Sequence, residues 1–364
     1  MEQEEQQQPS RTRWKTVLWV VVILILLGIG TVAGVGLYAA SSLEPVAATD
    51  EQVELTIEPG TGSAGIADQL ETKGLIRDAF IFKVYLKYKG EGSRFQAGTY
   101  AIATGTTLDD IIAMLNAGDT VKAEMVRFTI PEGFTVLQIA DKLASQGAVN
   151  RDVFLQTAED KAMFVATHPW IAQIPDSASM KHRMEGYLFP ETYEMKKGST
   201  EKDIVERMLQ ELDRKLAGLP VDWKDKLQAS GLTFHQMMTI ASLVEREVAV
   251  DAERTLVAGV IHNRMKQSMK LQIDATVQYA LDAPKDRLFE KDLLIEHPYN
   301  TYYVQGLPPG PIASPSLKSI QAALYPAETK YLYYVTKKDG TQAHYFAETY
   351  QQHLNNIDLS NKKR

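Results

Sequence analysis

The sequence predicts an α+β fold class: a single N-terminal transmembrane helix, a small subdomain of α/β repeats and a larger mixed α+β domain. The prediction rests on an uncharged run near the N-terminus, a strand-turn-helix motif that recurs at an offset of 73 residues, and helical spacing from about residue 151. A chain of 364 residues is also too long for one ordinary domain. The expected boundaries are 1–16 for the N-terminal segment, 17–38 for the transmembrane helix, 39–52 for a linker, 53–150 for the repeats and 151–364 for the large domain.

The uncharged run fixes the expected location of the protein. From Val17 to Tyr38 it has 22 residues, and at about 1.5 Å per residue these cover a bilayer core of roughly 30 Å. Arg11, Arg13 and Lys15 lie on its N-terminal side, so the N-terminus is expected in the cytoplasm and the large domain outside the cell membrane. A cleaved signal peptide is the alternative, but its apolar region would have only about 7 to 15 residues.

Composition excludes several classes of function. Lys plus Arg number 39 and Asp plus Glu 46, and this net charge of −7 argues against a nucleic-acid partner. The chain has no cysteine, which removes disulfides, thiolate metal sites and thiol nucleophiles. Its seven histidines form no metal-binding motif, so we expect neither a metal site nor a cofactor.

The repeated motif is a β-rich run, a glycine turn, a short helix with apolar residues at i, i+1 and i+4, and a glycine at the end of the helix. The first copy comprises 56–60, 66–70 and Gly74, the second 129–133, 139–143 and Gly147, and a weaker third spans 102–115. The motif resembles the LysM type of glycan-binding module. The alternative is an ordinary α+β subdomain that carries a duplicated motif without binding sugar.

The segment most suited to chemistry is a helix that begins after Thr233. Thr233 and Gln236 form a predicted capping box, and the helix should run to about residue 248. The predicted buried stripe comprises Met237, Ile240, Ala241, Val244 and Val248. Glu245 and Glu247 both flank this stripe, where desolvation would raise the pKa of a carboxyl and suit it to general acid catalysis. The spacing does not decide between the two acids, and a solvated helix end is the alternative reading.

The residues after this helix are rich in groups that could hold a sugar. A second helix is expected from Asp251 to about Gln267, and the segments 271–279, 298–303 and 306–312 combine aromatic rings with amides, hydroxyls and proline-stiffened turns. Aromatic rings cover the apolar faces of a sugar, while amides and hydroxyls bind its rim.

These segments carry a close resemblance to a known family. The set 241–247, 253–254, 263–264, 271–274, 299–302 and 306–312, with 185–193, 330–335 and 344–346, resembles the endolytic murein transglycosylases of the MltG or YceG-like type. The resemblance implies a catalytic glutamate at Glu245. It leads us to expect substrate-positioning roles for Glu247, Asn263, Arg264, Gln272, Asp274, Tyr299 and Asn300. Ala275 departs from the family, which usually has proline there, and 351–354 match its C-terminal motif only loosely.

The resemblance implies a lytic transglycosylase that cleaves the β-1,4 bond between N-acetylmuramic acid and N-acetylglucosamine in peptidoglycan. One carboxyl would act as acid and then as base, leaving a 1,6-anhydro end, whereas a hydrolase needs two carboxylates. Peptidoglycan strands, the bilayer and penicillin-binding synthases are the implied partners. Glu185, in the run Glu185-Gly186-Tyr187-Leu188-Phe189-Pro190, is interpreted as structural. The alternative function is a non-catalytic, membrane-tethered scaffold that binds peptidoglycan.

Overall fold

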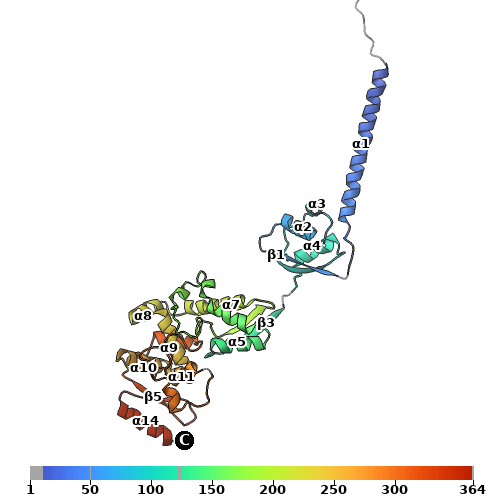
Figure 1. Ribbon diagram of the computed structural model, residues 1–364. Coiled ribbons are helices and arrows are strands. Elements are labelled where there is room, and N and C mark those ends of the chain that lie inside the picture. Colours follow the sequence, from blue (N-terminus) through green and yellow to red (C-terminus); the bar gives the residue numbers. More distant parts are fainter. Residues whose placement is uncertain (1–10, 50, 122–123, 282, 363–364) are drawn as a thin grey trace, which may run out of the picture. The chain divides into compact units, whose positions relative to one another are not determined.

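The computed structural model describes residues 11–49, 51–121, 124–281 and 283–362. The chain forms two compact units, Met1–Ala123 (unit 1) and Glu124–Arg364 (unit 2), both drawn in Figure 1. Each unit combines helices with two-stranded antiparallel sheets, so the predicted mixed α+β class is confirmed.

Unit 1 begins with the apolar helix α1, which spans Arg11–Leu43. Its segment Val17–Leu43 is long and apolar enough to cross a membrane, and its most apolar part has no buried side chain. The helix therefore continues past the expected end at Tyr38 into the expected linker. Small residues that tolerate a helix follow Tyr38, and Pro45 is the first residue that disfavours it.

The rest of unit 1 is built on one antiparallel strand pair. Strand β1 (Gln52–Ile57) pairs with β2 (Gly98–Ala103), with Leu55 opposite Tyr100. Helices α2 (Ser63–Thr72) and α3 (Ala79–Lys89) lie between the strands in sequence, and α4 (Leu108–Ala117) follows them. The inward side chains of both strands and the apolar faces of the three helices form a separate core.

The strand-turn-helix prediction is confirmed for all three copies of the motif. The first copy is β1 and α2, the weaker third copy is β2 and α4, and the second copy is β3 (Met125–Thr129) and α5 (Val136–Ser145). The second copy belongs to unit 2, however, so the boundary falls after Ala123 and not near residue 150. The reason is long-range pairing, because β3 binds β4 (Thr192–Lys196) and α5 packs on α6 (Arg151–Glu159).

The first half of unit 2 is mainly helical. Helix α6 packs on α7 (Glu201–Ala217), and α8 (Trp223–Ser230) follows, in the region whose spacing predicted helices. Two short 3-10 turns, η1 (Lys161–Met163) and η2 (Pro169–Gln173), connect α6 to β4. The turn η2 contacts helix α9 (Phe234–Glu247), which follows α8.

Helix α9 (Phe234–Glu247) is the central element of unit 2. Every residue from Met237 to Val244 is buried, so the helix is covered all round and not only along the predicted stripe. Helix α10 (Arg254–Lys266), preceded by η3 (Asp251–Glu253), packs on α9, as do α11 (Asp274–Ala280) and α13 (Leu317–Leu324).

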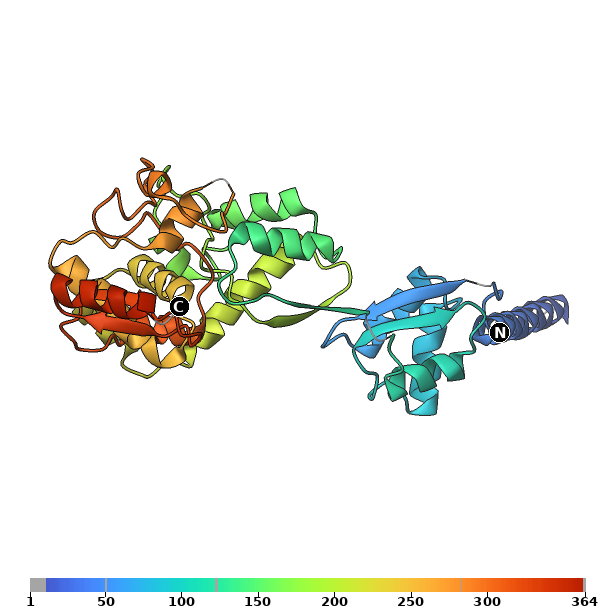
Figure 2. The same cartoon turned by 90° about the horizontal axis from the view of Figure 1, so that it is seen from below.

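The chain ends in a hairpin and a helix. Strands β5 (Tyr333–Thr336) and β6 (His344–Ala347) pair with each other, and α14 (Tyr350–Lys362) packs on both, as Figure 2 shows in red. Strand β5 also contacts α10, and the short α12 (Glu290–Leu293) contacts α11. The hairpin thereby comes to lie near the end of α9 that carries the candidate acids.

Candidate active site

Helix α9 positions both candidate acids in its last turn. The predicted capping box opens the helix, with Thr233 Oγ1 accepting from the Gln236 N–H at 3.1 Å and Gln236 Oε1 accepting from the Thr233 N–H at 2.9 Å. Val248 leaves the helix with extended φ and ψ angles. Residues two apart on a helix point in nearly opposite directions, so Glu245 and Glu247 meet different surroundings.

Glu245 lies in a dry, positively charged environment. Its side chain is 7% exposed, and its Oε2 accepts hydrogen bonds from Arg254 Nη1 at 3.2 Å, from the Ser316 N–H at 2.9 Å and from Ser316 Oγ at 2.5 Å. Arg254 also donates to Asp251 Oδ1 at 3.0 Å and to Ser319 Oγ at 2.6 Å. These charge-assisted hydrogen bonds hold the Glu245 carboxylate in place and connect α9 to α10 and α13.

The charge on Glu245 acts on a second carboxyl nearby. Burial raises the pKa of Glu132, and the charge of Glu245 raises it further. Glu132 precedes the glycine turn of the second repeat copy, where the Gly133 carbonyl accepts from Arg246 Nη1 at 3.1 Å. The end of α9 is therefore tied to the strand-turn-helix motif that opens unit 2.

Glu247 has the opposite environment. Its Oε2 accepts one hydrogen bond from the Tyr334 hydroxyl at 2.9 Å. Burial raises the pKa of Glu247 to about 7, the Tyr334 hydrogen bond opposes the increase, and the negative charge of Asp274 adds to it. Glu247 therefore exchanges its proton near neutral pH, as a general acid and base requires.

Glu247 lines a polar pocket of about 530 Å³. The side chains around it come from α9, α10, the segment before and within α11, the loop after α12, the β5–β6 hairpin and α14. The polar and aromatic residues that line it are Arg246, Glu247, Arg264, Gln272, Asp274, Tyr302, Tyr334, Thr336, His344 and His353. A concave site with one proton-exchanging carboxyl and many hydrogen-bonding groups suits a polar substrate such as a sugar.

The chain is similar to known proteins. The model of the YceG-like family matches residues 55–359. The chain belongs to the YceG-like family. A relative from Bacillus subtilis strain 168, named endolytic murein transglycosylase, is 35% identical over 331 residues, or 88% of this chain and 89% of that protein. A protein of the same name from Streptococcus pneumoniae serotype 2 is 32% identical over 360 residues, or 93% of this chain and 63% of that protein.

A solved structure is similar as well. The crystal structure of a YceG-like protein from Listeria monocytogenes has a TM-score of 0.56 and 32% sequence identity, and the match covers 84% of this chain and 99% of that one. The family membership expected from the sequence is therefore confirmed. The names of the relatives also support the expectation of a lytic transglycosylase.

Four of the residues expected at the site of this YceG-like protein line the pocket, namely Glu247, Arg264, Gln272 and Asp274. Glu245, Asn263, Tyr299 and Asn300 do not line it. The Asn263 amide donates to the carbonyls of Thr329 and Tyr331 at 2.8 and 2.9 Å.

Tyr299 and Asn300 are fully buried, and the Asn300 amide donates to the Leu293 and Ile295 carbonyls at 2.9 and 2.7 Å. The Asn300 amide therefore holds the loop that carries Tyr302, and that residue does line the pocket.

Sequence reasoning did not single out several pocket residues. Tyr302 donates to Asp274 Oδ1 at 2.6 Å, and Tyr334 contacts Glu247, yet both stood among other aromatic residues in their segments. Gln272 has φ of +52°, a left-handed conformation that is unfavourable for a residue with a side chain. Such strain often accompanies a binding site, because the surrounding structure holds the residue in place.

Glu185 lies elsewhere in unit 2 and is fully buried. Its Oε1 accepts from the Val136 N–H at 3.0 Å, at the start of α5, and its Oε2 accepts from the Tyr279 hydroxyl at 2.9 Å in α11. Burial raises the pKa of Glu185 to about 7. The residue thus connects the second repeat copy to α11, an arrangement compatible with the structural interpretation.

Proposed function

We propose that this chain is a membrane-anchored endolytic peptidoglycan transglycosylase. It cleaves the β-1,4 bond between N-acetylmuramic acid and N-acetylglucosamine and leaves a 1,6-anhydro end, which terminates a glycan strand during cell wall biogenesis. The main support for this proposal is that Glu247, a single carboxyl with a pKa near 7, lines a polar pocket. The names of the relatives support the same general activity.

Glu247, and not Glu245, is the acid in this proposal. A general acid must hold a proton that it can deliver to a substrate. Glu245 instead faces an arginine and two further donors that converge on one oxygen, and it does not line the pocket. The proposal therefore assigns Glu245 a structural role and moves the catalytic role, which the resemblance placed at Glu245, two residues along α9.

The reaction proceeds in two proton transfers. Glu247 first protonates the glycosidic oxygen, and the bond from that oxygen to C1 of the muramoyl sugar breaks. The resulting carboxylate then takes the proton of the 6-hydroxyl of the same sugar, and O6 bonds to C1. No water is consumed and Glu247 ends protonated, as it began. The Tyr334 hydroxyl donates to Oε2 and holds the carboxyl in place.

The other pocket residues hold the sugar. The Arg264 guanidinium is fixed by the backbone carbonyls of Leu332 at 2.6 Å and Leu271 at 2.7 Å. Gln272 offers an amide, and Tyr302 is fixed by its bond to Asp274. Asp274 supplies negative charge near Glu247, which favours the protonated acid and would stabilise the positive charge that develops at C1.

The proposed cellular arrangement follows from unit 1. We propose that α1 is a single-pass anchor in the cell membrane, with the N-terminus in the cytoplasm and unit 2 outside, close to newly made strands and to penicillin-binding synthases. We also propose that the β1–α2–α3–β2 arrangement is a LysM-like module that contacts glycan.

Because the chain has no cysteine, single introduced cysteines can test the membrane topology. An impermeant maleimide should label Glu54→Cys but not Gln7→Cys on intact cells, and the reverse pattern would contradict the orientation.

The activity is tested with full-length protein and polymeric peptidoglycan, with products identified by mass spectrometry. The native chain should release 1,6-anhydro ends, and Glu247→Gln should abolish their release. Glu245→Gln is the matched variant, and it should lower stability more than it lowers the rate of the folded fraction. If Glu245→Gln abolishes release with the fold intact while Glu247→Gln remains active, the two roles are exchanged. Reducing ends would indicate hydrolysis, and unchanged strand ends would favour the scaffold.

A further inference from the structure

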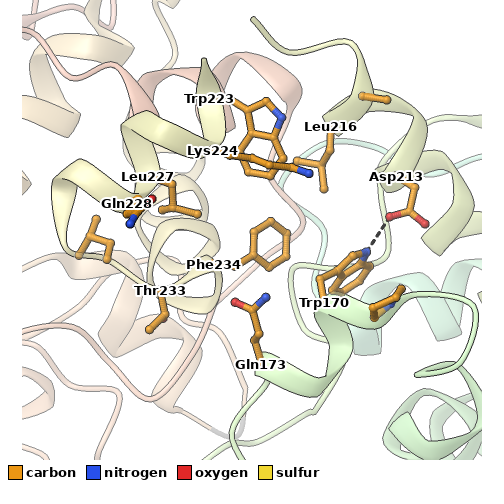
Figure 3. Close-up of a pocket in the computed structure, with 13 residues that line it drawn as sticks. Trp170, Gln173, Asp213, Leu216, Trp223, Lys224, Leu227, Gln228, Thr233 and Phe234 are labelled. Atoms are coloured by element: carbon orange, nitrogen blue, oxygen red, sulfur yellow. Dashed lines mark hydrogen bonds between the residues drawn. The ribbon is translucent and has the colours of Figure 1, made fainter. Parts of the chain in front are cut away.

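Unit 2 has a second pocket of about 740 Å³, shown in Figure 3, which shares no residue with the Glu247 pocket. The aromatic rings of Trp170, Trp223 and Phe234 surround this cavity, with Leu216 and Leu227 between them. Its polar members include Gln173, Lys224 and Gln228. We call this the aromatic pocket.

Trp170 is held in position before any ligand binds. Its Nε1 donates to Asp213 Oδ1 at 2.6 Å, and Asp213 Oδ2 contacts His168 Nδ1 at 2.5 Å. On one side the indole stacks on Tyr187, with ring centroids 5.2 Å apart. The ring is therefore fixed from behind, and a ligand that contacts it incurs little cost for ordering this side chain.

Several other residues around the pocket are exposed or only partly buried. Trp223 is the first residue of α8, a helix with no fully buried residue, and Lys224 Nζ lies 5.6 Å from the centre of its ring. The side-chain amides of Gln173 and Gln228 have no hydrogen-bond partner among the residues that the structure describes. In Figure 3 the Gln173 amide points toward the ring of Phe234, into the cavity.

We propose that the aromatic pocket binds sugars of an N-acetylated β-1,4-linked glycan strand, an inference that rests on the proposed function. The C–H faces of a pyranose ring pack on indole rings, while its hydroxyl and acetamido groups need amides at the rim. The pocket offers both, together with a Lys224 ammonium for the carboxylates of peptides attached to the strand. An apolar helix of a partner protein would bury the same rings but leave two amides and one ammonium without partners.

Helix α9 sets the separation between this pocket and the proposed acid. Phe234, its first residue, lines the aromatic pocket, and Glu247, its last, lines the polar one. At a rise of 1.5 Å per residue the two lie about 20 Å apart along the helix. Several consecutive sugars span this length, so a strand that occupies both pockets is cut at a fixed distance from the aromatic pocket, and long strands are then preferred over short fragments.

The test is calorimetric titration of full-length protein in detergent with a hexamer of β-1,4-linked N-acetylglucosamine. The protein carries Glu247→Gln, so that no turnover occurs. Trp223→Ala should weaken binding about tenfold, the order expected for loss of one ring from an aromatic-lined site, whereas Trp223→Phe should retain most of the affinity. Val221→Ala is the matched control, since Val221 lies two residues away and is 101% exposed. Gln173→Ala alters only the exposed rim and should weaken binding without affecting the fold.

A second readout uses active protein. Trp223→Ala should lower the ratio of kcat/KM for long strands to kcat/KM for short fragments. Equal hexamer affinity for the parent, Trp223→Ala and Gln173→Ala proteins would overturn the inference, as would binding of an apolar peptide in place of the hexamer. If the hexamer binds through Trp223 but native protein yields no anhydro ends, the glycan site stands and the proposed reaction fails.

Discussion

Replacing Tyr334 by phenylalanine should move the alkaline limb of the pH–rate profile upward. In the proposed mechanism the active enzyme has a protonated Glu247, so the rate falls as pH rises through its pKa of about 7. The Tyr334 hydroxyl donates to Glu247 Oε2 at 2.9 Å and stabilises the ionised form. Without this donor the carboxyl keeps its proton to higher pH.

The size of the shift follows from the strength of the lost bond. A hydrogen bond to a charged group contributes about 1.5–3 kcal/mol. One pH unit corresponds to about 1.36 kcal/mol, so the limb should move up by about 1–2 units. Asp274→Asn should move it in the opposite direction, because the charge of Asp274 raises the pKa of Glu247. Two nearly isosteric changes with opposite shifts cannot both result from a general loss of fold.

The assay is the initial rate of anhydro-end release from polymeric peptidoglycan, followed between about pH 5 and pH 9, with kcat/KM reporting the free enzyme. Tyr303→Phe is the control, since Tyr303 is 49% exposed and lies outside the pocket. An unchanged or lowered limb in Tyr334→Phe would refute the assignment of the proton to Glu247.

Three further outcomes concern stability. Arg254→Ala leaves Glu245 buried without its cation and should lower the free energy of unfolding by about 3–5 kcal/mol in denaturant titrations. Gln272→Val should cost about 1–3 kcal/mol because a β-branched residue resists positive φ, whereas Gln272→Gly should not, as thermal melts would record. The raised pKa of Glu185 means that the native state binds its proton more tightly than the unfolded chain does. Stability should therefore fall by up to about 3 kcal/mol between pH 4.5 and 7, and Glu185→Gln should flatten this slope.

The local elements could be predicted from sequence because their signals are local. Each repeat copy carries its own glycine turn and its own i, i+1, i+4 helix, so all three appeared as strand-turn-helix motifs. Strand partners depend on contacts far along the chain. Phe128 in β3 lies opposite Tyr193 in β4, and the local sequence around either residue does not predict that pairing. The boundary between the units was misplaced for this reason.

The two acids of α9 could not be separated from sequence for a similar reason. A helical wheel places Glu245 and Glu247 on either side of the apolar stripe, but their environments are supplied by other segments. Ser316 lies 71 residues after Glu245, and Tyr334 lies 87 residues after Glu247. Composition also cannot tell an amide that holds a loop from an amide that lines a pocket, so the sequence alone does not separate Asn300 from Gln272.

In a transglycosylase that uses one carboxyl, the pKa of that carboxyl must lie in a narrower range than in a hydrolase, where two carboxyls share the proton transfers. The same group must first give a proton and then take one, so a carboxyl that is too acidic fails in the first step and one that is too basic fails in the second. In Glu247 burial and the charge of Asp274 raise the pKa, while the Tyr334 hydroxyl limits the increase. The resulting value near 7 gives both directions of transfer a small driving force, so Tyr334 matters as much to the proposed reaction as the burial that it opposes.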